Sequence, residues 1–179
     1  FLLSQSFTHT SKKITALIKE SDELLPDETR LNSDPGRKAI FWHFRALNLA
    51  ALYVAGISTA TDDFEKAFNE VFKLDTPERG DVNKTVHELT AFTHFYYAGF
   101  LSEISDKSRA NDIRFHAEKS VEIVTSSKES FKVPFYILTI IERDKPLAER
   151  DHNYRWFTAL ASVSSKFAEY LSQNGWELQ

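Results

Sequence analysis

The segments that decide this fold are Ala46-Leu-Asn-Leu-Ala-Ala-Leu-Tyr53 and Asp63-Phe-Glu-Lys-Ala-Phe-Asn-Glu-Val-Phe-Lys-Leu74. In each segment apolar residues recur every three or four positions, which is the period of an amphipathic helix. Small residues alternate with large ones at that spacing, and small side chains let two helices approach closely. The segments therefore predict two helices that pack against one another.

The same pattern nearly recurs further along the chain. About 50 residues later, similar side chains return in the same order: Ala50, Tyr53, Ala67, Val71 and Leu74 are echoed by Ala98, Leu101, Ala117, Val121 and Val124. Helical hairpins that stack in this way bury their apolar faces and leave a concave surface for a partner. The recurrence predicts stacked antiparallel hairpins within a single domain over residues 1–179.

Composition narrows the fold class further. The chain has 179 residues, of which 42% are hydrophobic and 27% charged, as is typical of a globular protein. With 5 Gly and 5 Pro there is little material for the turns of an all-β fold, and no strand-like alternation is present. We therefore expect a soluble all-α protein of about seven helices.

The predicted helices follow from apolar spacing and from their end signals. They cover residues 7–25, 35–56, 63–74, 81–104, 109–126, 134–141 and 147–173. Asp34-Pro35 predicts an N-cap followed by the first helical residue, and Gly175 predicts a C-terminal stop. Residues 35–56 are apolar nearly all round, which predicts a buried central helix. Gly99 predicts a close approach by a neighbouring helix.

The two opening segments together resemble a tetratricopeptide repeat. The positions that carry the resemblance are Leu49, Ala50, Tyr53, Phe64, Ala67 and Pro77. The resemblance implies an α-solenoid that binds a peptide or protein, and it implies that Asn48 on the first helix faces the ligand groove. The recurrence of about 50 residues is longer than the family's usual 34. An irregular helical bundle is the alternative architecture.

The leading functional prediction is a non-catalytic scaffold or adaptor that binds a protein or peptide, as a possible subunit of a larger complex. We expect polar or aromatic side chains facing a groove between the hairpins to make this contact. The candidate partner-binding residues are Asn48, Tyr97, Arg114 and Lys119. The chain lacks Met at position 1, so we expect it to begin after processing or trimming. The compartment stays open.

The alternative is an enzyme. Two stretches, Arg37 to His43 and Arg109 to His116, resemble the Arg-polar-His motif of the helical HEPN ribonucleases. The resemblance implies metal-independent RNA cleavage, with His as general acid or base and Arg steadying the phosphate charge. Arg109 and His116 are the candidate catalytic pair.

Other chemistry is disfavoured by the residues present. The chain has no Cys, and His87 and His94 are two helical turns apart, about 10 Å by helix rise. We therefore predict neither a metal site nor a cofactor. A net charge of −4 makes nucleic acid an unexpected partner. The longest apolar runs are far shorter than the roughly 20 residues that a membrane-spanning helix needs, so we expect no such span.

Two further patterns predict structure rather than chemistry. The aromatic run from Phe92 to Phe100 is dense at helical spacing, which predicts a core position. The charged run from Glu142 to Asp151 mixes both signs, which predicts a solvated turn and helix start.

Overall fold

The computed structural model describes residues 12–13, 15–21, 23, 31, 34–57, 61–75, 82–104 and 107–178. Every regular element in these ranges is helical and none is a strand, which confirms the all-α class. The chain divides into two compact units, Phe1–Asn83 and Lys84–Gln179. The single domain over residues 1–179 stays a prediction. Pro77 and part of the predicted first helix (residues 7–11, 14, 22, 24–25) lie outside the described residues.

The first unit is built around α2 (Pro35–Val54) and α3 (Thr61–Leu74). The Asp34 side chain accepts hydrogen bonds from the backbone N–H of Gly36 at 2.9 Å and of Arg37 at 3.3 Å. The predicted N-cap with Pro at the first helical position is therefore confirmed. Past the end of α2, Gly56 adopts a φ of 69°, which an L side chain rarely tolerates.

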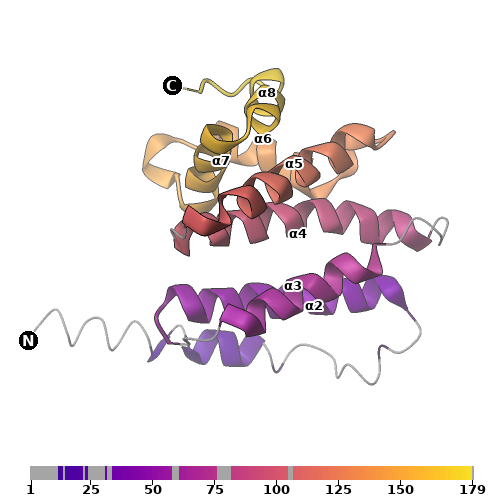
Figure 1. The fold of residues 1–179 in the computed structure, drawn as a ribbon, viewed down its shortest axis with the longest axis vertical. Coiled ribbons are helices and arrows are strands. Elements are labelled where there is room, and N and C mark those ends of the chain that lie inside the picture. The colour runs from indigo at the N-terminus through magenta and orange to yellow at the C-terminus, as the bar shows by residue number, and fades with distance from the viewer. Residues whose placement is uncertain are drawn as a thin grey trace, which may run out of the picture. The chain divides into compact units, whose positions relative to one another are not determined.

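Helices α2 and α3 lie side by side (Figure 1). The α2 residues that are buried are mostly small: Ala39, His43, Ala46 and Ala50. The buried α3 residues are larger: Phe64, Ala67, Phe68 and Val71. The prediction that α2 is buried all round is wrong, since Ile40 is 44% exposed and Phe44 48% exposed. The helix buries a stripe of small residues that permits close approach, and its bulkier neighbours remain outside that stripe.

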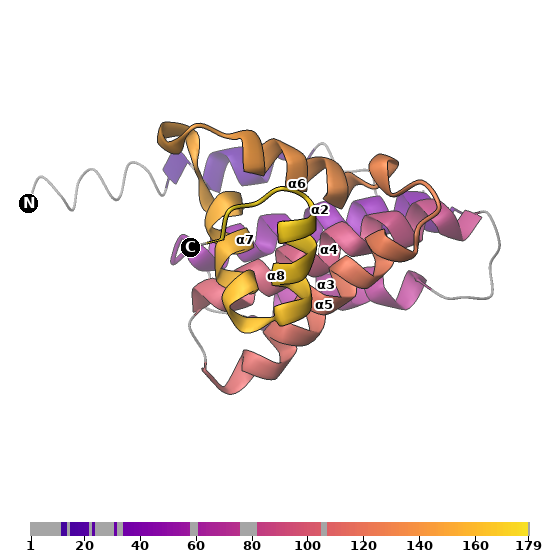
Figure 2. The same cartoon turned by 90° about the horizontal axis from the view of Figure 1, so that it is seen from above.

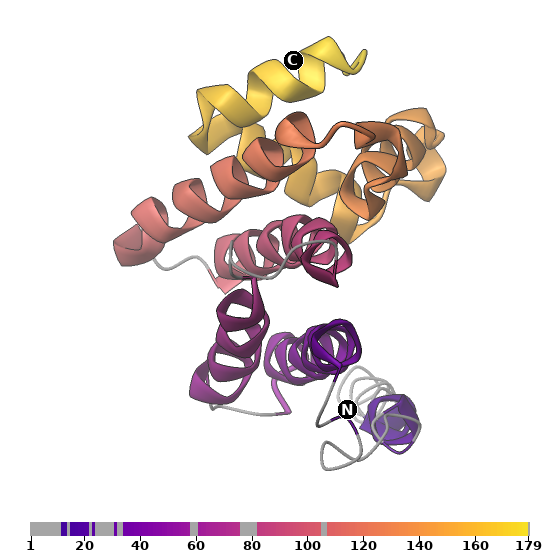
Figure 3. The same cartoon turned by 90° about the vertical axis from the view of Figure 1, so that its right-hand side faces the viewer.

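The second unit contains the remaining helices, except for the first two residues of α4 (Val82–Ile104), which belong to the first unit. These helices are drawn in Figure 2 and, from pink to yellow, in Figure 3. The helices after α4 are α5 (Ala110–Ser126), α6 (Pro134–Asp144), α7 (His152–Val163) and α8 (Ser165–Gln173). Short 3₁₀ turns connect them: η2 (Lys107–Arg109), η3 (Ser130–Lys132) and η4 (Leu147–Glu149). Helix α5 packs against both α7 and α8.

The last predicted helix is broken in the structure, so the continuous helix over residues 147–173 is wrong. A 3₁₀ turn ends before Asp151, whose side chain caps α7, and a second break falls at Ser164. Ser164 has extended backbone and accepts the N–H of Phe167 at 3.2 Å. A serine competes with the helix for backbone hydrogen bonds, so it favours the start of a new helix. Gly175, with a φ of 81°, is confirmed as the stop.

An aromatic core holds the second unit together, as the run from Phe92 to Phe100 predicted. Phe95 is fully buried, and its ring centroid lies 4.4 Å from that of Phe157 and 5.4 Å from that of Phe135. Gly99 lies against the indole of Trp156, where a Cβ would be 2.6 Å from Cε3. The predicted close helix approach at Gly99 is confirmed, with α7 as the neighbour.

The positions of the recurring sequence pattern are all buried in the second unit, whereas in the first unit Tyr53 and Leu74 are only half-buried. Ala50, Ala67 and Val71 are buried in the first unit. Their counterparts in the second unit, Ala98, Leu101, Ala117, Val121 and Val124, are buried as well. The tetratricopeptide type of repeat stays a prediction.

Candidate functional site

A pair of histidines lies between α4 and α5 in the second unit. The Nδ1 atoms of His94 and His116 are 2.6 Å apart, and the ring centroids are 4.8 Å apart. His94 is 8% exposed, whereas His116 is half-buried. Beside them Phe115 is 53% exposed, with its ring centroid 5.1 Å from that of His116. One edge of the pair is therefore buried and the other is bordered by an open aromatic face.

Tyr97 connects the two candidate catalytic residues, Arg109 and His116. The ring centroid of Tyr97 lies 4.6 Å from that of His116, and its hydroxyl accepts from Nη2 of Arg109 at 3.1 Å. Nε of Arg109 donates to Asp112 at 2.7 Å, which fixes the guanidinium beside α5. The structure thus places Tyr97, which the sequence predicted as a partner-binding residue, beside Arg109 and His116, which the sequence predicted as a catalytic pair.

Both imidazoles of this cluster are held neutral at pH 7. Burial lowers the pKa of His116 to about 4; Asp112 opposes this shift and Arg109 reinforces it. Burial also lowers the pKa of His94 well below its usual value, and the neighbouring His116, Lys119 and His87 lower it further. A neutral imidazole can accept a proton, but a pKa of about 4 makes His116 a weaker base than an imidazole whose pKa lies near 7.

The other candidate residues are distributed more widely. Asn48 lies in the first unit, where its amide exchanges hydrogen bonds with Ser21 at 3.1 and 3.4 Å. Nε of Arg114 donates to the carbonyl of Val163 at 3.1 Å, which satisfies the end of α7. Nζ of Lys119 lies 2.9 Å from both carboxylate oxygens of Glu122. A partner-binding role for Asn48, Tyr97, Arg114 and Lys119 stays a prediction.

The second Arg-to-His stretch has a different environment. Arg37 is an exposed residue at the start of α2, and its Nε lies 3.4 Å from the carboxylate of Asp34. His43 is 1% exposed within the buried stripe of α2, and burial lowers its pKa to about 4. In the stretch from Arg109 to His116, both the arginine and the histidine contact Tyr97. No such shared contact joins Arg37 and His43 among the contacts described for them.

A groove of about 750 Å³ runs along α7 in the second unit. The segment that follows α8 returns alongside α7 (Figure 2), and the ring centroids of Tyr154 and Trp176 are 5.1 Å apart. The lining residues come from four segments: Arg143, Asp144, Arg150, Tyr154, Thr158, Ala161, Ser162, Ala168, Gly175, Trp176, Glu177 and Leu178. The volume falls within the range of roughly 300–1,000 Å³ that is usual for ligand sites.

The two arginines of this groove differ in their partners. Arg143 is held by the carboxylate of Asp144 at 2.7 and 2.9 Å and by the carbonyl of Asn174 at 2.9 Å. The guanidinium carbon of Arg150 lies 4.2 Å from the centroid of the Tyr154 ring. The one hydrogen bond that this guanidinium makes within the described chain is long, from Nε of Arg150 to the carbonyl of Lys145 at 3.5 Å. The charge of Arg143 is thus compensated, and that of Arg150 faces the groove on an aromatic platform.

The charged run before α7 is more buried than the sequence indicated. Glu142 is 1% exposed, and its carboxylate lies 2.7 Å from Nζ of Lys145. The same Nζ lies 2.7 Å from the carboxylate of Asp151. The predicted solvated turn is confirmed for Asp144 and for Glu149 to Asp151, which are exposed, but it is wrong for Glu142, whose buried carboxylate is compensated by Lys145.

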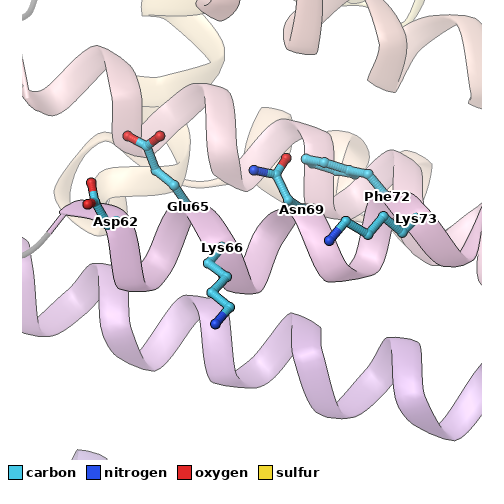
Figure 4. A pocket seen from close by; sticks show the side chains of 6 residues that line it. All are labelled: Asp62, Glu65, Lys66, Asn69, Phe72 and Lys73. Carbon is cyan, nitrogen blue, oxygen red and sulfur yellow. The ribbon is translucent and has the colours of Figure 1, made fainter.

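A second hollow lies on the surface of α3 in the first unit (Figure 4). The residues that line it belong to this one helix and carry both charge signs: Asp62, Glu65, Lys66, Asn69, Phe72 and Lys73. Nζ of Lys73 lies 2.6 Å from the carboxylate of Glu70. These are features of a solvated helix face, and they converge on no ligand position.

Sequence reasoning missed His94 as the neighbour of His116, and it missed Arg150 and Tyr154 as parts of one groove. Helical spacing relates His94 only to His87, because both lie on one helix, and it carries no information about His116 on the next helix. The sequence signal for the groove is the four-residue interval from Arg150 to Tyr154, but a matching interval occurs on most helices.

Within the described ranges, no group of three or more His, Cys, Asp or Glu side chains could hold a metal ion. No described helix is long and apolar enough to cross a bilayer. Comparisons of the chain with protein-family models, with curated proteins and with solved structures find no match.

Proposed function

We propose that this protein is a non-catalytic binding protein that takes an extended peptide segment of a protein partner in the groove along α7. The observation that carries the proposal is the guanidinium of Arg150, which lies on the ring of Tyr154 and has no carboxylate of the described chain within ion-pair distance. A planar guanidinium in that position suits a carboxylate, which it can bind through two parallel hydrogen bonds. The favoured ligand therefore carries an acidic side chain.

The wall of the groove suits an extended backbone. Thr158 donates its hydroxyl hydrogen to the carbonyl of Arg155 at 2.8 Å, and Ser162 donates to that of Ala159 at 2.6 Å. Each hydroxyl oxygen keeps lone pairs that can accept a peptide N–H. Thr158 and Ser162 are four residues apart on α7, which corresponds to a rise of about 6 Å along the helix axis. Alternate N–H groups of an extended strand are about 6.6 Å apart, which is a close match.

The charge of the groove limits the ligand further. Glu177 also lines it, so a run of acidic residues would be repelled there. The protein as a whole has a net charge of −4, which gives no general attraction for an acidic partner. The proposal is therefore a segment with one carboxylate placed against Arg150, and not a polyacidic tail.

A peptide-display selection on the purified protein tests this proposal. Sequences selected by the parent should share a Glu or Asp, and Arg150→Ala should fail to enrich them. Arg155→Ala is the matched control, because Arg155 lies on α7, five residues after Arg150, and is outside the groove lining. Selected peptides without a common carboxylate, or equal enrichment by Arg150→Ala, would overturn the proposal.

A second candidate function is metal-independent cleavage of RNA, and it is favoured by the contacts that join Arg109, Tyr97 and His116. A neutral His116 would take the proton from a ribose 2′-hydroxyl, whose oxygen attacks phosphorus while the bond to the 5′-oxygen breaks, and the 5′-oxygen leaves as a hydroxyl with a proton from water. Arg109 would compensate the charge that builds on the phosphate oxygens. The exposed ring of Phe115 offers a face on which a base can stack.

Single-stranded RNA of mixed sequence, incubated with the protein and a metal chelator, tests the second candidate. The parent should form a cyclic phosphate and a 5′-hydroxyl end, and Arg109→Ala/His116→Ala should not. Arg37→Ala serves as the arginine control from the other stretch. Intact RNA with the parent would discard this candidate and leave the peptide proposal untouched.

A further inference from the structure

The two Nδ1 atoms of His94 and His116 face one another at 2.6 Å, and that distance requires a hydrogen between them. A neutral imidazole carries its hydrogen on one nitrogen and leaves the other bare. One Nδ1 must therefore donate and the other accept. It follows that the two rings hold opposite tautomers.

We infer that His94 is a positioning residue for His116: it accepts a hydrogen bond from Nδ1 of His116 and so leaves Nε2 of His116 bare, as the proton acceptor of the site. The inference rests on the second candidate function. The direction of the hydrogen bond follows from what happens after proton uptake. Once Nε2 of His116 gains a proton, both nitrogens of that ring carry hydrogen, so Nδ1 must donate to His94. For a proton taken up by His116, only this arrangement serves the neutral and the charged state without turning a ring.

The surroundings favour His94 as the partner that stays neutral. It is the more buried of the two rings, and burial disfavours a charge there. Three cationic or ionisable groups act on it from α4 and α5: His116, Lys119 and His87. His116 is closer to the surface, and the carboxylate of Asp112 favours its charged form while Arg109 opposes it. A proton taken up by the pair therefore resides on His116.

Long-range proton–nitrogen correlation spectra of the histidine-labelled parent at pH 7 test the inference. His116 should carry its hydrogen on Nδ1 and His94 on Nε2, with His116→Gln used to assign the signals. In His94→Leu, His116 should lose this preference. In His94→Asn the side-chain oxygen can still accept, so His116 should keep it. His152→Gln, at an exposed histidine, is the control and should change nothing.

The RNA assay separates the inference from the function on which it rests. If the parent cleaves RNA, His94→Leu should lower kcat by up to about a hundredfold with KM unchanged, and His94→Asn should restore most of it. Hydrogen on Nδ1 of His116 and on Nε2 of His94 without cleavage would discard the RNA function and retain the inference, whereas the reverse assignment would overturn the inference. Identical tautomers in the parent, or an unchanged His116 in His94→Leu, would overturn the inference whatever the RNA does.

Discussion

Gly99 of α4 lies directly against the indole of Trp156 of α7, so that a Cβ at position 99 would be 2.6 Å from Trp156 Cε3 and 2.8 Å from Cγ. Trp156 is 5% exposed, and the ring of Phe100 lies 4.8 Å from it, centroid to centroid. A rigid, enclosed ring has no direction in which to yield. The absence of a side chain at position 99 therefore sets how closely α4 and α7 approach.

Gly99→Ala should lower the free energy of unfolding by about 1–3 kcal/mol, because the added methyl overpacks the core. Helix propensity alone would favour Ala by about 1 kcal/mol, so the sign of the change distinguishes the two effects. Urea unfolding measures it. The penalty should shrink when Trp156→Leu is combined with it, and a stabilised Gly99→Ala would contradict the packing argument.

Phe95→Ala should cost about 3–5 kcal/mol of unfolding free energy, since the fully buried ring packs against Phe135 and Phe157 and its loss leaves a cavity. Phe131→Ala removes the same side chain from a position that is 59% exposed, and it should change stability by less than about 0.5 kcal/mol. Chemical denaturation of both variants gives the comparison. Equal losses at the two positions would contradict the assignment of the core.

Ser164→Ala should destabilise the start of α8 by about 1–2 kcal/mol, because the hydroxyl that accepts the N–H of Phe167 is lost at a buried position. Ser165→Ala is the control, since the neighbouring serine is exposed and is already helical. Amide hydrogen exchange should quicken in α8 for the first variant alone. Unchanged exchange in Ser164→Ala would show that the helix start does not depend on this cap.

Acid should destabilise the protein between pH 6.5 and about 4. Burial lowers the pKa of His116 and of His43 from 6.5 to about 4, so the unfolded chain binds protons in this window before the folded chain does. Stability is therefore complete above pH 6.5 and is lost as the pH falls, by roughly 3 kcal/mol for His116 alone. Urea unfolding at several pH values measures the slope, which His116→Gln should reduce. A slope of the opposite sign would contradict the burial of these rings.

The helical ends were predictable because their signals are local. Asp34-Pro35 satisfies the first N–H groups of α2 from within the same few residues, and Gly175 ends α8 through its own φ. The break at Ser164 escaped prediction because the apolar spacing continues through it. A single serine hydroxyl changes the chain direction there, and periodicity does not register one hydrogen bond.

The sequence by itself determined the all-α class, most helix ranges, the small residues at close contacts and the aromatic core of the second unit. Each of these depends on spacing along one helix, which apolar periodicity records. Only the tertiary structure decided that His94 meets His116, that Arg150 and Trp176 border one groove, and that Glu142 is buried with Lys145. Those relationships depend on how separate helices and the segments between them are placed, and side-chain packing across the core fixes that placement.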